Sequence, residues 1–217
     1  MQVTVLIPAY NEEHGIGNVL DAFLDLMKSQ DIDGEIIVIN DGSVDGTANV
    51  VRSRNGVRLI EHDLNRGYGA SLKTGIRHAG YDLILIADAD GTYPIESIPA
   101  LLSSIDQFDM VVGARIGKHV RIPWARRPAK WLLNRLAKFL ARRDIPDLNS
   151  GLRVFRKELA ERFFPLFPDG FSFTITITMA ALTNGYRVKF VPVNYYKRTG
   201  KSSIRPKIGR ASCRERV

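Results

Sequence analysis

Apolar runs and helical patterns alternate along the first half of the chain. The predicted strands are 3–7, 35–39, 57–61 and 83–87, and the predicted helices between them are 16–27, 47–54 and 70–79. Strands that are apolar throughout and are linked by helices are typical of a parallel sheet whose two faces are both covered. The pattern therefore predicts an α/β fold with a mostly parallel central sheet and helices on both faces.

The second half continues this pattern less regularly. We predict strands at 110–112, at a short segment ending at Phe155 and at 187–191, with helices at 158–164 and 173–184. Between them, residues 128–142 place Trp131, Phe139 and several leucines at helical spacing with the cations mostly elsewhere, which predicts a basic amphipathic helix. Residues 197–203 are basic and contain glycine, and we expect a mobile loop there.

The length of 217 residues suits one substantial α/β domain. We assign residues 1–208 to this domain and expect residues 209–217, which have neither period nor apolar content, to be a vector-derived, non-native tail. The single cysteine, Cys213, excludes an internal disulfide framework and a cysteine-based zinc site, and favours a reducing compartment. No run approaches the roughly 20 apolar residues of a membrane span, so we expect the chain as given to be soluble. The cysteine usage fits a cytosolic face best.

The charge is strongly positive and local. A formal charge of +8 and a pI of about 9.7 indicate an anionic partner: nucleic acid, a membrane surface or a phosphorylated substrate. Residues 118–143 hold nine lysines and arginines and no acidic residue. On the predicted amphipathic helix, such cations could meet anionic lipid while the apolar face enters the headgroup boundary. The alternative is an ordinary helix whose apolar face packs on the core.

Two aspartates follow the most apolar strand. Asp88 and Asp90 lie just beyond residues 83–87, where ligands of parallel sheets bind. One residue into a loop, carboxylates at this spacing can converge on a hard divalent cation through oxygen ligands. The alternative is a purely structural turn, because turn formers and a helix cap follow at 91–94.

A second polar group follows the first two predicted strands. Tyr10, Asn11 and Glu12 would lie beside Asp41 if these strands pair. A carboxylate there can accept hydrogen bonds from uracil or guanine, another can hold ribose hydroxyls, and a tyrosine can stack on the base. The alternative is that Asp41 and Ser43 shape a turn while Asn11 and Glu12 cap the first helix.

Phosphate binding must come from cations, because the sequence has neither a Gly-x-Gly-x-x-Gly turn after the first strand nor a Walker A motif. A metal at the aspartates supplies one positive charge. The candidate cationic side chains are Arg115, Arg127, Arg153 and Lys201.

Five spaced motifs together resemble those of the inverting glycosyltransferase family two. They are Ile7-Pro8-Ala9-Tyr10-Asn11-Glu12, Asn40-Asp41-Gly42-Ser43-Val44-Asp45-Gly46-Thr47, Asn65-Arg66-Gly67-Tyr68-Gly69-Ala70, Asp88-Ala89-Asp90 and Asn149-Ser150-Gly151-Leu152-Arg153. The similarity is greatest to the branch of dolichyl-phosphate mannose synthase and bacterial undecaprenyl-phosphate glycosyltransferases, and it spans residue 3 to about residue 204.

The resemblance implies a GT-A fold, a nucleotide-sugar donor with uridine or guanosine as its nucleoside, and Mg²⁺ or Mn²⁺ at the aspartates. By motif position, Pro8, Tyr10, Glu12 and Asp41 would form the nucleoside pocket, Asp88 and Asp90 would ligate the metal, and Ala89 would contact the donor. Arg115 and Arg127 would face the diphosphate and the acceptor phosphate, and Arg153 and Lys201 would close on them. Family members commonly have a third ligand after the aspartates, and Thr92 occupies that region here.

The resemblance also implies an activity. The Gln-x-x-Arg-Trp motif of processive synthases does not occur in the sequence, so transfer of one sugar is expected. We expect metal-dependent transfer, with inversion, to a polyprenyl phosphate, with Asp90, Arg115 and Arg127 as catalytic residues and no nucleic-acid partner. The alternatives are transfer to a soluble or protein-linked hydroxyl, and a basic binding module in which the aspartates are structural.

Overall fold

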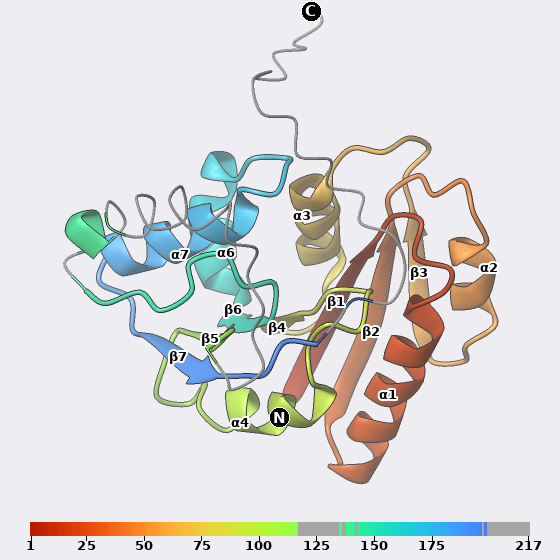
Figure 1. Ribbon diagram of the computed structural model, residues 1–217, viewed down its shortest axis with the longest axis horizontal. Helices are drawn as coiled ribbons and strands as arrows, with labels where there is room; N and C mark the ends of the chain where they lie inside the picture. The colour runs from red at the N-terminus through yellow and green to blue at the C-terminus, as the bar shows by residue number, and fades with distance from the viewer. Residues whose placement is uncertain (117–134, 136–137, 142, 197, 199–217) are drawn as a thin grey trace, which may run out of the picture.

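The computed structural model describes residues 1–116, 135, 138–141, 143–196 and 198 (Figure 1). One seven-stranded sheet has the order β3-β2-β1-β4-β6-β5-β7. Its strands are β1 (Gln2–Ala9), β2 (Asp33–Asn40), β3 (Val57–Glu61), β4 (Leu83–Ile86), β5 (Met110–Ala114), β6 (Arg153–Arg156) and β7 (Val188–Pro192). All neighbours pair in parallel except β6, which is antiparallel to β4 and β5. The prediction of a mostly parallel sheet is confirmed.

Helices cover both faces of this sheet, as predicted (Figure 1). The elements on one face are α1 (Ile16–Ser29), α2 (Thr47–Arg52) and α4 (Ile98–Leu102), the last preceded by a 3₁₀ turn at Ile95–Ser97. The elements on the other face are α3 (Tyr68–His78), α6 (Lys157–Phe163) and α7 (Phe173–Thr183), with a 3₁₀ turn at Phe164–Leu166. One large hydrophobic core lies on each side of the sheet, and a smaller cluster of Ala141, Ile145, Leu148 and Leu182 packs against side chains of α7 and β7.

Alternation along β1 explains why both faces are covered. Val3, Val5 and Ile7 point into the core shared with α1, whereas Leu6 points into the core shared with α3. Successive side chains of a strand point to opposite faces, so a strand that is apolar at nearly every position needs a cover on each side. The apolar run of β1 is therefore typical of a strand in the middle of a sheet that is covered on both faces.

The sequence pattern missed some features. The helix at α4 was not predicted, because it is only five residues long and its periodicity is too short to recognise. The antiparallel direction of β6 was not predicted either. Of the predicted amphipathic helix at 128–142, residues 135 and 138–141 are described and helical, and the remainder lies outside the described residues. The predicted tail at 209–217 and the predicted loop residues 197 and 199–203 also lie outside them.

Candidate active site

A cleft of about 680 Å³ opens where β1, β2, β4 and β5 end. The residues that line it are Pro8, Ala9, Tyr10, Glu12, Asp41, Asn65, Gly67, Tyr68, Ser71, Asp88, Ala89, Asp90, Tyr93, Arg115, Asn149, Gly151, Phe171, Thr174, Tyr195 and Arg198. Four of the five motifs follow the carboxyl ends of parallel strands or begin α3, and all five contribute residues to this wall. The carboxyl ends of parallel strands meet at one edge, so motifs far apart in the sequence face one another.

Asp88 and Asp90 stand after β4 on the floor of the cleft. The Tyr68 hydroxyl donates to Asp88 Oδ1 at 3.2 Å, and Thr92 donates to Asp90 Oδ1 from its backbone N–H at 3.1 Å and its hydroxyl at 2.7 Å. Burial and the charge of Asp90 raise the pKa of Asp88 to about 6. Two carboxylates whose negative charges act on one another, one of them in a buried setting, form a negative position that favours a cation.

Gly151 lets Asp88 approach the β6 loop. A Cβ atom at residue 151 would lie 2.5 Å from Asp88 Oδ2, too close for any other amino acid without displacement of the carboxylate. The Gly151 N–H donates to the Tyr93 hydroxyl at 2.7 Å, which fixes this loop against the segment after Asp90. The Asn149-Ser150-Gly151 motif therefore shapes the wall around the aspartates.

Arg198 supplies a cation to the same position from the far end of the chain. Its guanidinium forms an ion pair with Glu12 and lies 3.7 Å from Asp90 Oδ2. Burial raises the pKa of Glu12 to about 7; the Arg198 charge lowers it, and the Asp90 and Asp88 charges raise it further. Arg198 thus neutralises part of the carboxylate cluster. In the sequence, Arg198 belongs only to the predicted basic loop at 197–203.

Arg115 faces the cleft from the end of β5 in a rigid position. Its Nε and Nη2 donate to the two carboxylate oxygens of Asp147 at 2.7 and 2.9 Å, and Nη2 also donates to the Asn149 carbonyl at 2.9 Å. Burial opposes the charge, but the hydrogen-bonded Asp147 raises the pKa of Arg115 above its usual range. Arg115, one of the four candidate cations, therefore presents a permanent positive charge to the cleft. Asp147 is a supporting residue that sequence reasoning missed.

The loops after β1 and β2 are tied to one another. Asn11, in the left-handed region with φ of 56°, accepts the Val44 N–H at 2.9 Å, and its own N–H donates to the Ser43 hydroxyl at 2.9 Å. The Glu12 N–H donates to the Thr47 hydroxyl at 2.9 Å. These bonds hold together the ends of β1 and β2 that carry Pro8, Tyr10 and Asp41, at the end of the cleft that we call the nucleoside end. Glu12 lies toward the aspartates instead, because it shares Arg198 with Asp90. The same two loops therefore form turns and line the cleft, so the two interpretations given from the sequence do not exclude each other.

Arg153 lies elsewhere than the motif led us to expect. It is fully buried beneath the cleft and does not belong to its wall; its guanidinium donates to the Thr174 carbonyl and the Thr178 hydroxyl, both at 3.0 Å, and to the Ser150 carbonyl. Burial lowers its pKa. Arg153 pairs with Ile86 at the cleft end of β4, but its side chain shares the sheet face of Phe155, two residues on, and α7 covers that face. In this structure Arg153 joins β6 to α7.

Arg127 and Lys201 lie outside the described residues, and their predicted roles remain predictions. Several aromatic side chains of the wall escaped the sequence analysis, namely Tyr68, Tyr93, Phe171 and Tyr195. Phe171 stacks on Tyr68 with 5.6 Å between ring centroids, and Arg115 lies 5.3 Å above the Tyr195 ring. Tyr68 belongs to the Asn65–Ala70 motif, which was a usable signal; the other three stand in segments without a motif.

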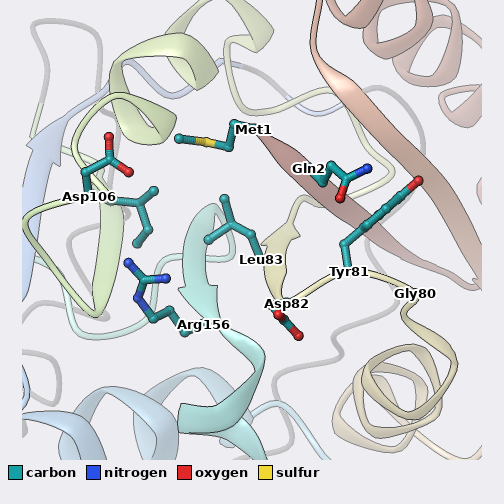
Figure 2. A pocket seen from close by; sticks show the side chains of 9 residues that line it. Met1, Gln2, Gly80, Tyr81, Asp82, Leu83, Asp106 and Arg156 are labelled. Carbon is teal, nitrogen blue, oxygen red and sulfur yellow. The ribbon is translucent and has the colours of Figure 1, made fainter.

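A smaller hollow of about 310 Å³ lies at the opposite edge of the sheet, where β1 and β4 begin. Figure 2 shows Asp82, Asp106 and Arg156 among the side chains around it. None of the five motifs reaches it. It therefore provides charged positions for control substitutions that are distant from the cleft.

The family is shown by comparison with known proteins. The family described as "Glycosyl transferase family 2" matches residues 4–164. This chain belongs to that family. It is a glycosyltransferase, and the prediction made from the five motifs is confirmed.

Named relatives match nearly the whole chain. A dolichyl-phosphate hexose transferase of Haloferax volcanii is 32% identical, with 97% of this chain and 90% of the relative covered. An undecaprenyl-phosphate mannosyltransferase of Micrococcus luteus is 28% identical, with 91% of this chain and 85% of the relative covered. The names of both relatives include a polyprenyl phosphate, which is dolichyl phosphate in the first and undecaprenyl phosphate in the second.

Solved structures match the fold. Glucosyl-3-phosphoglycerate synthase from Mycobacterium tuberculosis, in a complex with Mn²⁺, uridine diphosphate and phosphoglyceric acid, superposes with a TM-score of 0.71 at 19% identity, and 91% of this chain and 72% of that chain are covered. The same enzyme has been solved with Mg²⁺ and uridine diphosphate. At this identity the similarity shows a shared fold, and the predicted GT-A architecture is confirmed.

Proposed function

We propose that this glycosyltransferase moves a single sugar from a nucleoside diphosphate sugar to a polyprenyl phosphate, with inversion, at the cytosolic face of a membrane. The observation that carries this proposal is the cleft itself, which holds a carboxylate cluster at Asp88 and Asp90 and the fixed cation Arg115. The acceptor class is supported by the names of the relatives from Haloferax volcanii and Micrococcus luteus.

The residues of the cleft fit a divalent cation. Among the described residues, no group of three or more His, Cys, Asp and Glu side chains is arranged to hold a metal without other ligands. The two carboxylates of Asp88 and Asp90 nevertheless form a negative position, and the guanidinium of Arg198 at 3.7 Å from Asp90 Oδ2 is a sign that this position attracts positive charge. We propose that these two aspartates hold Mg²⁺ or Mn²⁺ and that donor phosphate oxygens complete the ligand set. Such an ion supplies electrostatic stabilisation of the departing diphosphate.

Arg115 would bind the anionic groups that meet in the cleft. Because Asp147 and Asn149 hold its guanidinium in place, it needs little reorganisation when negative charge develops on the departing diphosphate. In the proposal, Arg127 and Lys201 add further positive charge from segments beyond the described residues.

A phosphate acceptor removes the need for a strong general base. The second pKa of a phosphate monoester is about 6, so the acceptor is largely dianionic at pH 7. Asp90 then orients the acceptor and the cation without taking a proton. A hydroxyl acceptor would instead require a carboxylate that accepts a proton during the attack.

Exposed apolar side chains support a lipid acceptor. Phe171 forms part of the cleft wall and is 54% exposed, and Phe139 and Leu140 are 78% and 56% exposed. Within the described part of the chain, no helix has the length and apolar character required to cross a bilayer. Contact with the membrane surface, and not insertion of a described helix, is therefore what we propose for this domain.

The test is transfer of radiolabelled sugar. Donors carrying uridine or guanosine diphosphate would be incubated with Mn²⁺ and either undecaprenyl phosphate or a soluble hydroxyl acceptor, and the products separated by organic extraction. We expect label in the lipid fraction that is lost with EDTA. Label confined to the hydroxyl acceptor would overturn the lipid acceptor, and absence of nucleotide binding would overturn the enzymatic assignment of the cleft.

A further inference from the structure

A buried histidine stands behind Asp41 at the nucleoside end. His62 follows the last residue of β3, and because β3 pairs with β2 in parallel, the residues after both strands lie side by side. His62 Nδ1 lies 2.7 Å from Asp41 Oδ1, and Nε2 lies 3.0 Å from the Thr74 hydroxyl on α3. The two side chains of the pair are 4% and 5% exposed. No motif of the sequence analysis included His62.

The protein already fills most of the acceptor positions of the Asp41 carboxylate. An ionised carboxylate has about four acceptor positions, two on each oxygen. Oδ1 accepts from His62 Nδ1, which must carry its proton because a carboxylate only accepts, and from the Arg66 N–H at 2.9 Å. Oδ2 accepts from the Gly67 N–H at 2.8 Å. One acceptor position on Oδ2 remains for a molecule in the cleft.

This single position distinguishes two kinds of base. Uracil presents one ring N–H between two carbonyl groups, and one acceptor satisfies it. Guanine presents a ring N–H and an amino group side by side, which pair with a carboxylate through two parallel hydrogen bonds and require a free position on each oxygen. Asn65, which also lines the cleft, carries an amide group that can donate to a uracil carbonyl.

We propose that the Asp41–His62 pair selects a uridine diphosphate sugar over a guanosine diphosphate sugar as the donor. This inference rests on the proposed function, since it specifies the donor of the same cleft. Asp41 contacts the base through Oδ2. His62 is a positioning residue whose Nδ1–H fills an acceptor position on Asp41 Oδ1. A guanine base in this position would leave a donor without a partner, which costs about tenfold or more in affinity.

The experiment measures the dissociation constants of uridine diphosphate and guanosine diphosphate, each with Mn²⁺, by calorimetry. The native protein should bind uridine diphosphate at least about tenfold more tightly. His62→Leu frees a position on Oδ1, so the ratio of the two constants should fall toward one. His62→Gln, whose amide can donate to Asp41, should restore the preference. The control is His78→Leu on the exposed end of α3, which should leave the ratio unchanged.

The outcomes separate the two proposals. Equal or tighter binding of guanosine diphosphate to the native protein would overturn the donor selection and leave the glycosyltransferase proposal intact. An unchanged ratio in His62→Leu would overturn the role of His62. If that variant does not fold, the native ratio and His62→Gln still decide. Binding of neither nucleotide would overturn the proposed function of the cleft together with this inference.

Discussion

The carboxylates at the two ends of the cleft differ in how many hydrogen bonds they accept from the protein. At the nucleoside end, Asp41 accepts three hydrogen bonds from the protein. At the other end, which we call the aspartate end, Asp88 and Glu12 have raised pKa values because they are buried near other carboxylates with few donors. A carboxylate that accepts several hydrogen bonds is held in one orientation, which suits it to recognise a ligand. A buried group of carboxylates with few hydrogen-bond donors is stabilised when a cation binds to it. In the proposed function, nucleoside binding therefore belongs to one end and cation-dependent chemistry to the other.

The largest expected effect comes from the aspartate end. Asp90→Asn removes one charge from the position that attracts a cation, and we expect transfer to fall about a thousandfold and Mn²⁺-dependent donor binding to be lost. Steady-state transfer and calorimetry measure both. The matched control is Asp106→Asn in the opposite hollow, which should retain activity. Near-native turnover of Asp90→Asn would show that the aspartate end does not carry the chemistry.

The second prediction concerns the fixed guanidinium. Arg115→Lys keeps the charge but loses the paired hydrogen bonds to Asp147, so we expect kcat to fall about a hundredfold while the protein stays folded. Arg156→Lys at the opposite edge serves as the control. If Arg115→Lys transferred sugar at the native rate, a fixed guanidinium would not be required, and charge alone at this end would suffice.

The third prediction concerns the cation already present at the aspartate end. Arg198→Gln removes the positive charge beside Glu12 and Asp90, so Mn²⁺ should bind the donor-free protein about fivefold more tightly. Titration with Mn²⁺ monitored by electron paramagnetic resonance gives the affinity. Arg187→Gln, which breaks a distant pair with Asp109 at the same 3.7 Å separation, is the control. Weaker Mn²⁺ binding in Arg198→Gln would mean that Arg198 does not compete with the ion.

The smallest expected effect is a change in pH dependence. The folded protein holds the Glu12 proton more tightly than the unfolded chain, because the pKa of Glu12 is raised from 4.5 to about 7. This stabilisation is complete below pH 4.5 and is lost as the pH rises through 7. Glu12→Gln should therefore flatten the decline in Tm between pH 5 and pH 8 by about 3 °C. Thermal unfolding at both pH values measures this.

Glu158→Gln, an exposed substitution on α6, is the control for this pH profile. It should reproduce the native change in Tm. A Glu12→Gln profile that is parallel to the native one would show that Glu12 is ionised in the folded protein across this range.

The nucleoside end was largely predictable because its motifs are local. Pro8 lies near the end of β1, and Tyr10 and Asp41 follow β1 and β2; both strands are apolar enough to recognise, and their parallel pairing brings these residues together. His62 was not predictable, because a lone histidine after a strand gives no signal until its neighbour in space is known. The aspartate end shows the same limit, since Arg198 lies 108 positions after Asp90 in the sequence and reaches it only through the fold.

Arg115 and Arg153 show what the sequence could predict about the cleft and what required the fold. Both arginines belong to segments that pointed to the cleft, and only Arg115 lines it. Both lie at the cleft end of their strands, but Arg115 follows β5 in the loop, whereas Arg153 is within β6 and its side chain is on the sheet face that α7 covers. The hydrophobic pattern reveals that a strand exists, but not which helix covers the face on which a given side chain lies.

By itself the sequence determined the family, the α/β class and the strand ends that carry chemistry, because apolar periodicity and short motifs are local properties. The tertiary structure alone decided which carboxylates are satisfied, which arginine faces the cleft and which cation neutralises Glu12. Those properties depend on distances between residues far apart in the chain and on burial, and both exist only after the sheet has assembled.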